Sequence, residues 1–129
     1  MGYYFNKVIN NISFDEAIDK ARKELIKEDF DIVSEIDFKK TFKEKINKDY
    51  PEYIVLGACN TELANEAVHA EKLLGLMLPC NILVKRIDEN SIEIAIVDPK
   101  ASLALFENKE VEKIAETLQE KLVKVINHL

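Results

Sequence analysis

Two Cys-Asn dipeptides are the residues of this chain whose types and spacing could do chemistry. They are Cys59-Asn60 and Cys80-Asn81, and they contain both cysteines of the 129-residue sequence. A thiol can act as a nucleophile, a redox group or a metal ligand, and an asparagine amide can donate a hydrogen bond to an anion or a carbonyl. Each dipeptide stands at the edge of an apolar run, where a strand is expected to meet a loop. If those strand ends lie side by side, they form a candidate ligand site.

Two carboxylates complete the set of candidate ligand-binding residues. Glu35 lies inside an apolar segment, and Asp37 follows on the same face of the predicted strand. A carboxylate in such surroundings could have a raised pKa and act as a general base. The simpler alternative is that this face is wet, or that Glu35 pairs with a lysine. The sequence assigns no catalytic residue, and the spacing of its Cys and His residues matches no standard zinc pattern, so no metal site is predicted.

The cysteines allow two interpretations of function. Cys59 precedes a predicted helix that Asn60 or Thr61 can cap, and the helix dipole favours a thiolate there. A thiol-dependent enzyme, redox or nucleophilic, would use Cys59, with Cys80 as a resolving thiol. Buried, reduced packing residues are the structural alternative for both. Because no activating base is visible beside either cysteine, we favour a small-ligand-binding module, while enzymatic activity and cofactors stay open.

Composition excludes several partners. The formal net charge of −6 argues against nucleic acid or an anionic membrane surface as the main partner. No apolar run approaches the ~20 residues of a membrane span, and the first residues lack the pattern of a secretion signal. Two cysteines without such a signal predict reduced thiols and a cytoplasmic location.

The hydrophobic pattern predicts alternating strands and helices in one domain over residues 1–129. Ser13 and Glu16 form a capping box, which marks the start of a helix. Alternation places Ile32, Ser34 and Ile36 on one face of the second strand, and Asp98-Pro99 closes the last strand. The predicted strands cover residues 2–9, 30–36, 53–59, 81–87 and 91–97, and the predicted helices 14–25, 38–46, 60–72 and 111–126.

These elements predict an α+β fold, a five-stranded, mostly antiparallel sheet with the long helices on one face. The third and fourth strands should be antiparallel neighbours, which would place Cys59 and Cys80 at the same end of adjacent strands. The other sheet face would carry Val33, Leu83, Ala95 and Val97, with an aromatic residue of the first strand. A soluble monomer does not leave such a face bare. A partner subunit, the short helices or a ligand must cover it, so we expect a homodimer.

Several sequence blocks resemble the domain-of-unknown-function 302 family. They are the Met-Gly-Tyr-Tyr-Phe start, Ser-Phe-Asp-Glu-Ala at 13–17, Glu-Ile-Asp at 35–37, the run 53–60 ending in Gly-Ala-Cys-Asn, Leu-Pro-Cys-Asn at 78–81, and Asp-Pro at 98–99. Members commonly have Pro after the first Cys-Asn, where this chain has Thr61. The resemblance implies a compact α+β fold of the TATA-binding-protein-like kind and homodimers, and it implies no reaction.

Overall fold

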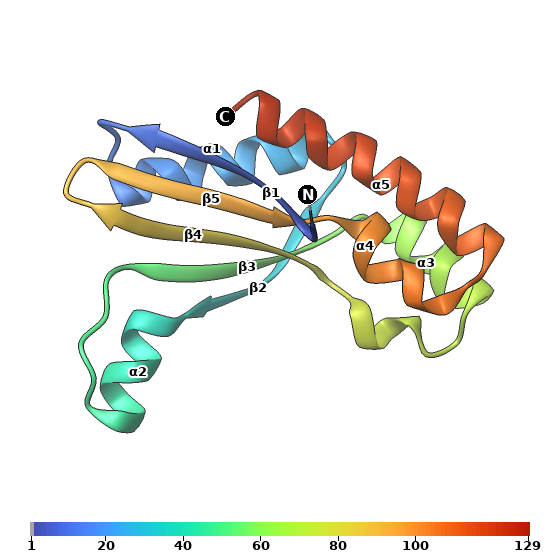
Figure 1. The fold of residues 1–129 in the computed structure, drawn as a ribbon, viewed down its shortest axis with the longest axis horizontal. Coiled ribbons are helices and arrows are strands. Elements are labelled where there is room, and N and C mark those ends of the chain that lie inside the picture. Colours follow the sequence, from blue (N-terminus) through green and yellow to red (C-terminus); the bar gives the residue numbers. More distant parts are fainter. Residues whose placement is uncertain (1) are drawn as a thin grey trace.

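Five strands form one antiparallel sheet, in the order β1-β5-β4-β3-β2. A computed structural model describes residues 2–129 (Figure 1). The sheet confirms the predicted α+β fold class and the antiparallel pairing of the third and fourth strands. The elements are β1 (Tyr4–Asn10), α1 (Phe14–Lys27), β2 (Asp31–Asp37), α2 (Phe38–Ile46), β3 (Tyr53–Cys59), α3 (Thr61–Ala70), the 3₁₀ helix η1 (Leu74–Met77), β4 (Cys80–Asp88), β5 (Ser91–Val97), α4 (Pro99–Leu103), the 3₁₀ helix η2 (Ala104–Phe106) and α5 (Lys109–Asn127).

Helices α1 and α5 cover one face of the sheet. Helix α1 starts at the predicted capping box, in which the Glu16 backbone N–H donates to Ser13 Oγ and the Ser13 N–H donates to the Glu16 carboxylate. It connects β1 and β2, the two edge strands, and therefore crosses the whole sheet. Beneath the helices, Ile92, Ile94 and Ile96 of β5 are fully buried. Burying each such side chain stabilises the fold by roughly 1.5–3 kcal/mol, so the alternation in β5 determines which face the helices cover.

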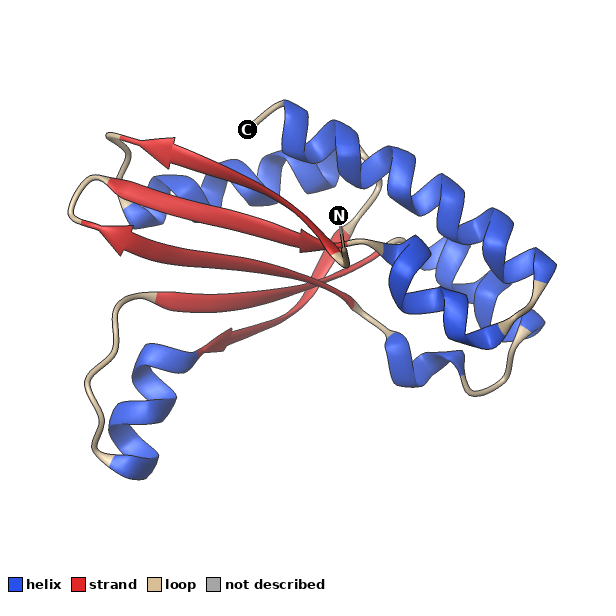
Figure 2. Cartoon of the chain, in the orientation of Figure 1, coloured by secondary structure: helices blue, strands red, loops and turns tan. Residues whose placement is uncertain are grey.

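The opposite sheet face is not covered in this way, and we call it the open face. Helix α2 projects on that side, away from α1 and α5 (Figure 1), and none of its residues is fully buried. Phe38 at its start contacts Tyr53 of β3 with ring centroids 5.9 Å apart. The remaining helices gather at the end of the sheet where β3 ends and β4 begins (Figure 2).

The predicted alternation in the second strand is wrong, because β2 contains a bulge. The pairing with β3 shifts between Ile32 and Ser34, so Val33 has no partner opposite it. An extra residue in one strand moves all later side chains to the other face. Ser34 and Ile36 therefore lie on the open face, opposite Gly57 and Val55, whereas Ile32 packs against the core. Glu35 and Asp37 do share a face, as predicted, on the side of α1.

The sequence predicted that Asp98-Pro99 closes the last strand. In the structure this dipeptide also starts helix α4. The Asp98 carboxylate accepts a hydrogen bond from the Lys100 backbone N–H, 2.9 Å away, and Pro99 occupies the first turn of α4. Proline is favoured there because its missing N–H has no partner in a first turn. Helix α4 was not predicted, since five residues are too few to show a helical period.

Candidate functional site

The two Cys-Asn dipeptides meet at the predicted corner of the sheet. Ala58 lies directly opposite Cys80 in the β3–β4 register, so Cys59 is the next residue along β3. Both thiols line the same small cavity. The predicted meeting of the two strand ends is therefore confirmed, and no disulfide joins the two cysteines in the structure.

Asn60 at this corner caps helix α3. Its side-chain Oδ1 accepts a hydrogen bond from the Leu63 backbone N–H at 3.2 Å, and the residue is only 7% exposed. Of the two predicted caps, Asn60 rather than Thr61 fulfils the role, and Thr61 is the first helical residue. The side-chain amide of Asn60 is therefore held in place by its role as the N-cap of α3.

The cavity that the thiols share is small and mostly apolar. Its volume is about 10 Å³, and apart from Cys59, Asn60 and Cys80 every lining residue is Leu or Ala. This volume accommodates about one water molecule. Burial, together with a smaller effect of the neighbouring Cys59 thiolate, raises the pKa of the Cys80 thiol to about 11. Within residues 2–129, no acidic, basic or imidazole side chain lines this cavity that could activate a thiol.

The other three candidate residues lie away from the cavity. Asn81 is exposed on the open face, because neighbouring residues of a strand point to opposite sides. Glu35 forms an ion pair with Arg22 of α1, so the predicted pairing with a basic residue involves arginine rather than lysine. Asp37 caps α2 by accepting a hydrogen bond from the Lys40 N–H at 3.1 Å. Neither carboxylate reaches the corner, where Asp31 stands opposite Cys59 instead.

A larger hollow lies on the open face, above β3, β4 and β5. Its volume is about 400 Å³, and Asn81 contributes to its lining. Val55, Leu83 and Ala95 form its apolar floor, one from each of the three strands, and Tyr53 stands at its rim. The sequence had predicted the apolar character of this face. It had not predicted a hollow there, because the tyrosines that border it come from segments 50 residues apart in the chain.

Within residues 2–129, no three His, Cys, Asp or Glu side chains gather closely enough to hold a metal ion. None of the helices in the same range combines the length and apolar character needed to cross a bilayer.

Comparisons with known proteins give a family and a fold. The family model of the domain of unknown function DUF302 matches residues 5–129. A crystal structure of an uncharacterized conserved DUF302 protein from Bacillus stearothermophilus superposes with a TM-score of 0.89. The two sequences are 17% identical, over 99% of this chain and 98% of that one, so this likeness shows the fold alone. No curated protein matches the sequence. Because the family model spans nearly the whole chain, the protein belongs to the DUF302 family.

Proposed function

We propose that the protein is a homodimeric small-ligand-binding module that holds its ligand in the hollow on the open face. The main support for this proposal is the hollow itself, about 400 Å³ in volume, with an apolar floor and polar groups at its rim. Ligand sites in proteins typically measure about 300–1,000 Å³ and combine these two features. A bound ligand would also cover apolar surface that otherwise faces water.

In this proposal the Cys-Asn corner does not bind the ligand but holds β4 and Asn81 in position. Its cavity of about 10 Å³ is too small for an organic ligand, and Asn60 is engaged in capping α3. Asn81 is the member of the two dipeptides that borders the hollow. Packing at the corner fixes the start of β4, and Asn81 is thereby positioned on the opposite face. The thiol-dependent enzyme is not favoured, since burial opposes ionisation of Cys80 and the cavity lining offers no base.

Filling the hollow tests the binding function. A fragment library of neutral, cationic and anionic compounds is screened against the wild-type protein by ligand-observed NMR. We expect the hits to lose at least about tenfold in affinity for Ala95→Phe, because a phenyl ring placed on the floor occupies the space of the ligand. Val8→Phe is the matched control, since Val8 lies on the same open face in β1 but does not line the hollow. Hits that bind all three proteins equally would refute a site in the hollow.

Dimerisation is the second part of the proposal, and we place its interface at the leucine-rich end around η1 and η2. Leu73, Leu76 and Leu105 are 69%, 82% and 75% exposed there. Large exposed apolar groups of this kind mark interaction surfaces, and this position leaves the hollow free for a ligand. We also propose a cytoplasmic location, in which both thiols would stay reduced.

Sedimentation of the protein tests the dimer. We expect the wild type to sediment at twice the 14.8 kDa chain mass at micromolar concentration, and Leu76→Asp with Leu105→Asp to give the single-chain mass. A buried aspartate in each half of the interface is strongly unfavourable. Ile26→Asp is the control, because Ile26 is equally apolar and 62% exposed on α1. A wild-type protein that sediments as a single chain would end this part of the proposal.

A further inference from the structure

We infer that the hollow selects a neutral, planar aromatic ligand that carries one hydrogen-bonding substituent directed at Asn81. This inference deepens the proposed function and depends on it. It rests on three features of the open face, namely a continuous apolar floor, tyrosines at two corners and a charge pair that is internally neutralised.

The floor is a continuous apolar strip because its side chains stand side by side across neighbouring strands. Val55 lies opposite Leu83, and Leu83 lies opposite Ala95. Strands in a sheet are about 4.8 Å apart, so the three side chains form an apolar strip roughly 10 Å long, close to the length of a bicyclic aromatic ring. Ala95 is the smallest of the three and deepens the floor at its end.

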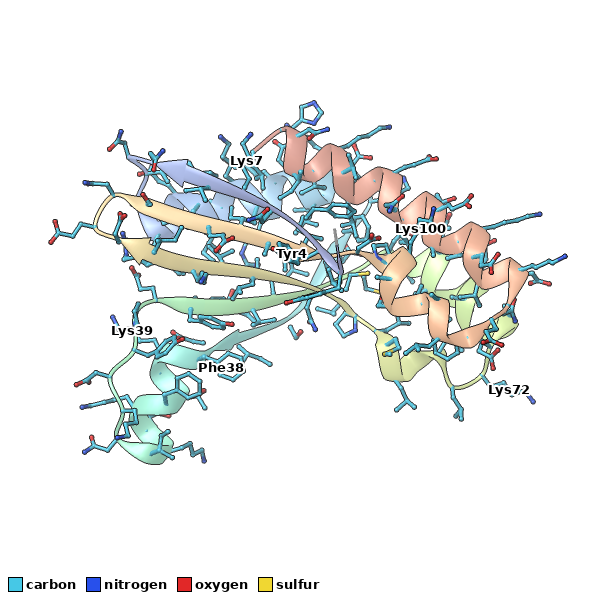
Figure 3. All side chains as sticks on the ribbon, in the orientation of Figure 1. Tyr4, Lys7, Phe38, Lys39, Lys72 and Lys100 are labelled. Carbon is cyan, nitrogen blue, oxygen red and sulfur yellow. The ribbon has the colours of Figure 1, made fainter. Side chains whose placement is uncertain are left out.

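Tyrosines border the strip at diagonally opposite corners. Tyr53 begins β3, on the side of the hollow next to α2 and Phe38, and its ring contacts that of Phe38. Tyr4 lies on β1 opposite Val97, and its ring packs edge-on against that of Tyr3 at 5.0 Å. Figure 3 labels Tyr4, near the start of β1, and Phe38, at the start of α2. Aromatic rings prefer edge-to-face or offset contacts with one another, so these walls favour an aromatic ligand over a branched aliphatic one.

Glu93 is the charged residue that lines the hollow, and its charge is balanced by Lys85 beside the hollow. Lys85 and Glu93 lie opposite each other in the β4–β5 register, with Lys85 Nζ 3.6 Å from Glu93 Oε1. Glu93 also accepts a hydrogen bond from the Asn6 side-chain amide at 2.7 Å. An ionic ligand would lose hydration on the apolar floor without gaining an unpaired counter-charge. The rim therefore disfavours both anions and cations.

Asn81 supplies the polar contact. It stands opposite Gly57, which has no side chain to crowd it, and it is exposed on the same face as the floor. Its amide offers a donor and an acceptor to a substituent at the edge of the ring. A hydroxyl or amide group on the ligand matches this chemistry.

Four probes that share the naphthalene ring system but differ in charge and substituent test the selectivity of the hollow. The probes are 2-naphthol, 2-naphthoate, 2-naphthylmethylammonium and naphthalene, at pH 7, titrated into the full chain. The readout is quenching of tyrosine fluorescence, because the chain has four tyrosines and no tryptophan, and three of the tyrosines line the hollow. We expect 2-naphthol to bind at least about tenfold more tightly than either ion.

Two variants locate the contacts. Asn81→Ala should weaken the binding of 2-naphthol by roughly three- to tenfold, as expected for one lost hydrogen bond, and should leave the affinity for naphthalene unchanged. Ala95→Phe should abolish quenching by both, while Val8→Phe should not. Equal losses for 2-naphthol and naphthalene in Asn81→Ala would remove Asn81 from its assigned role and overturn the inference.

The outcomes separate this inference from the proposed function. If either ion binds as tightly as 2-naphthol and Ala95→Phe blocks it, the ligand class is wrong and the binding site stands. If no probe binds and the fragment library yields no hit sensitive to Ala95→Phe, both fail. If tyrosine fluorescence changes with protein concentration alone and Ala95→Phe prevents this, a second copy covers the hollow, and the inference is overturned.

Discussion

Replacing Gly57 with alanine is expected to destabilise the protein by about 3 kcal/mol, the upper part of the range for overpacked sites. A Cβ atom at this position of β3 would collide with Ser34 Oγ on β2 and lie 2.7 Å from Pro79 Cγ. The serine hydroxyl can rotate away, but the ring of Pro79, the residue just before β4, cannot move without shifting the strand. Denaturant unfolding of the wild type and of Gly57→Ala measures the difference.

Gly75→Ala is the matched control for this prediction. A Cβ atom added at Gly75, in η1, meets no atom within 4 Å, so stability should not fall. Adding Ser34→Ala to Gly57→Ala should restore part of the loss, because it removes one of the two colliding atoms and leaves the contact with Pro79. Unfolding midpoints of Gly57→Ala and wild type that coincide would show that β2, β3 and the Pro79 segment do not pack as described.

The Cys80 thiol should resist alkylation in the folded protein by at least about 100-fold relative to the unfolded chain. Burial raises its pKa from about 9 to about 11, so roughly one thiol in a thousand is ionised at pH 8, and only the thiolate reacts. The partly exposed Cys59 should react faster. Labelling with iodoacetamide, followed by mass spectrometry of Cys59→Ser and Cys80→Ala, measures each rate separately. Equal alkylation rates of Cys59 and Cys80 in the folded protein would contradict the burial of Cys80.

The same burial predicts how stability responds to alkaline pH. The folded-state pKa of Cys80 lies above that of the unfolded chain, so between about pH 9 and pH 11 the unfolded state binds fewer protons. Stability must therefore fall as the pH rises through this window, by about 2–3 kcal/mol in total from this group. The difference in unfolding free energy between wild type and Cys80→Ala isolates the effect from the titration of lysines and tyrosines. A difference that stays constant from pH 8 to pH 11 would show that the thiol is not buried.

The sequence by itself determined the elements and their order. The capping box at Ser13, the alternation of Ile92, Ile94 and Ile96, and the helical spacing after Val111 are local signals, since each depends only on residues within a few turns or a few strand positions. Strand order followed partly from the same signals, because neighbouring strands joined by short connections usually pair. The meeting of Cys59 and Cys80 was predictable for this reason.

Tertiary structure alone decided which residues share a surface. The bulge at Val33 reverses the faces of β2, and nothing in the pattern of Ile32, Ser34 and Ile36 distinguishes a bulged strand from a regular one. The role of Glu35 depended on the position of Arg22, which lies on a different element. The hollow on the open face brings Tyr4 together with residues of β3, β4 and β5, and its depth depends on the small side chain of Ala95. Such a site arises from strand register and packing between distant segments, and these are set by burial of the core rather than by any local pattern.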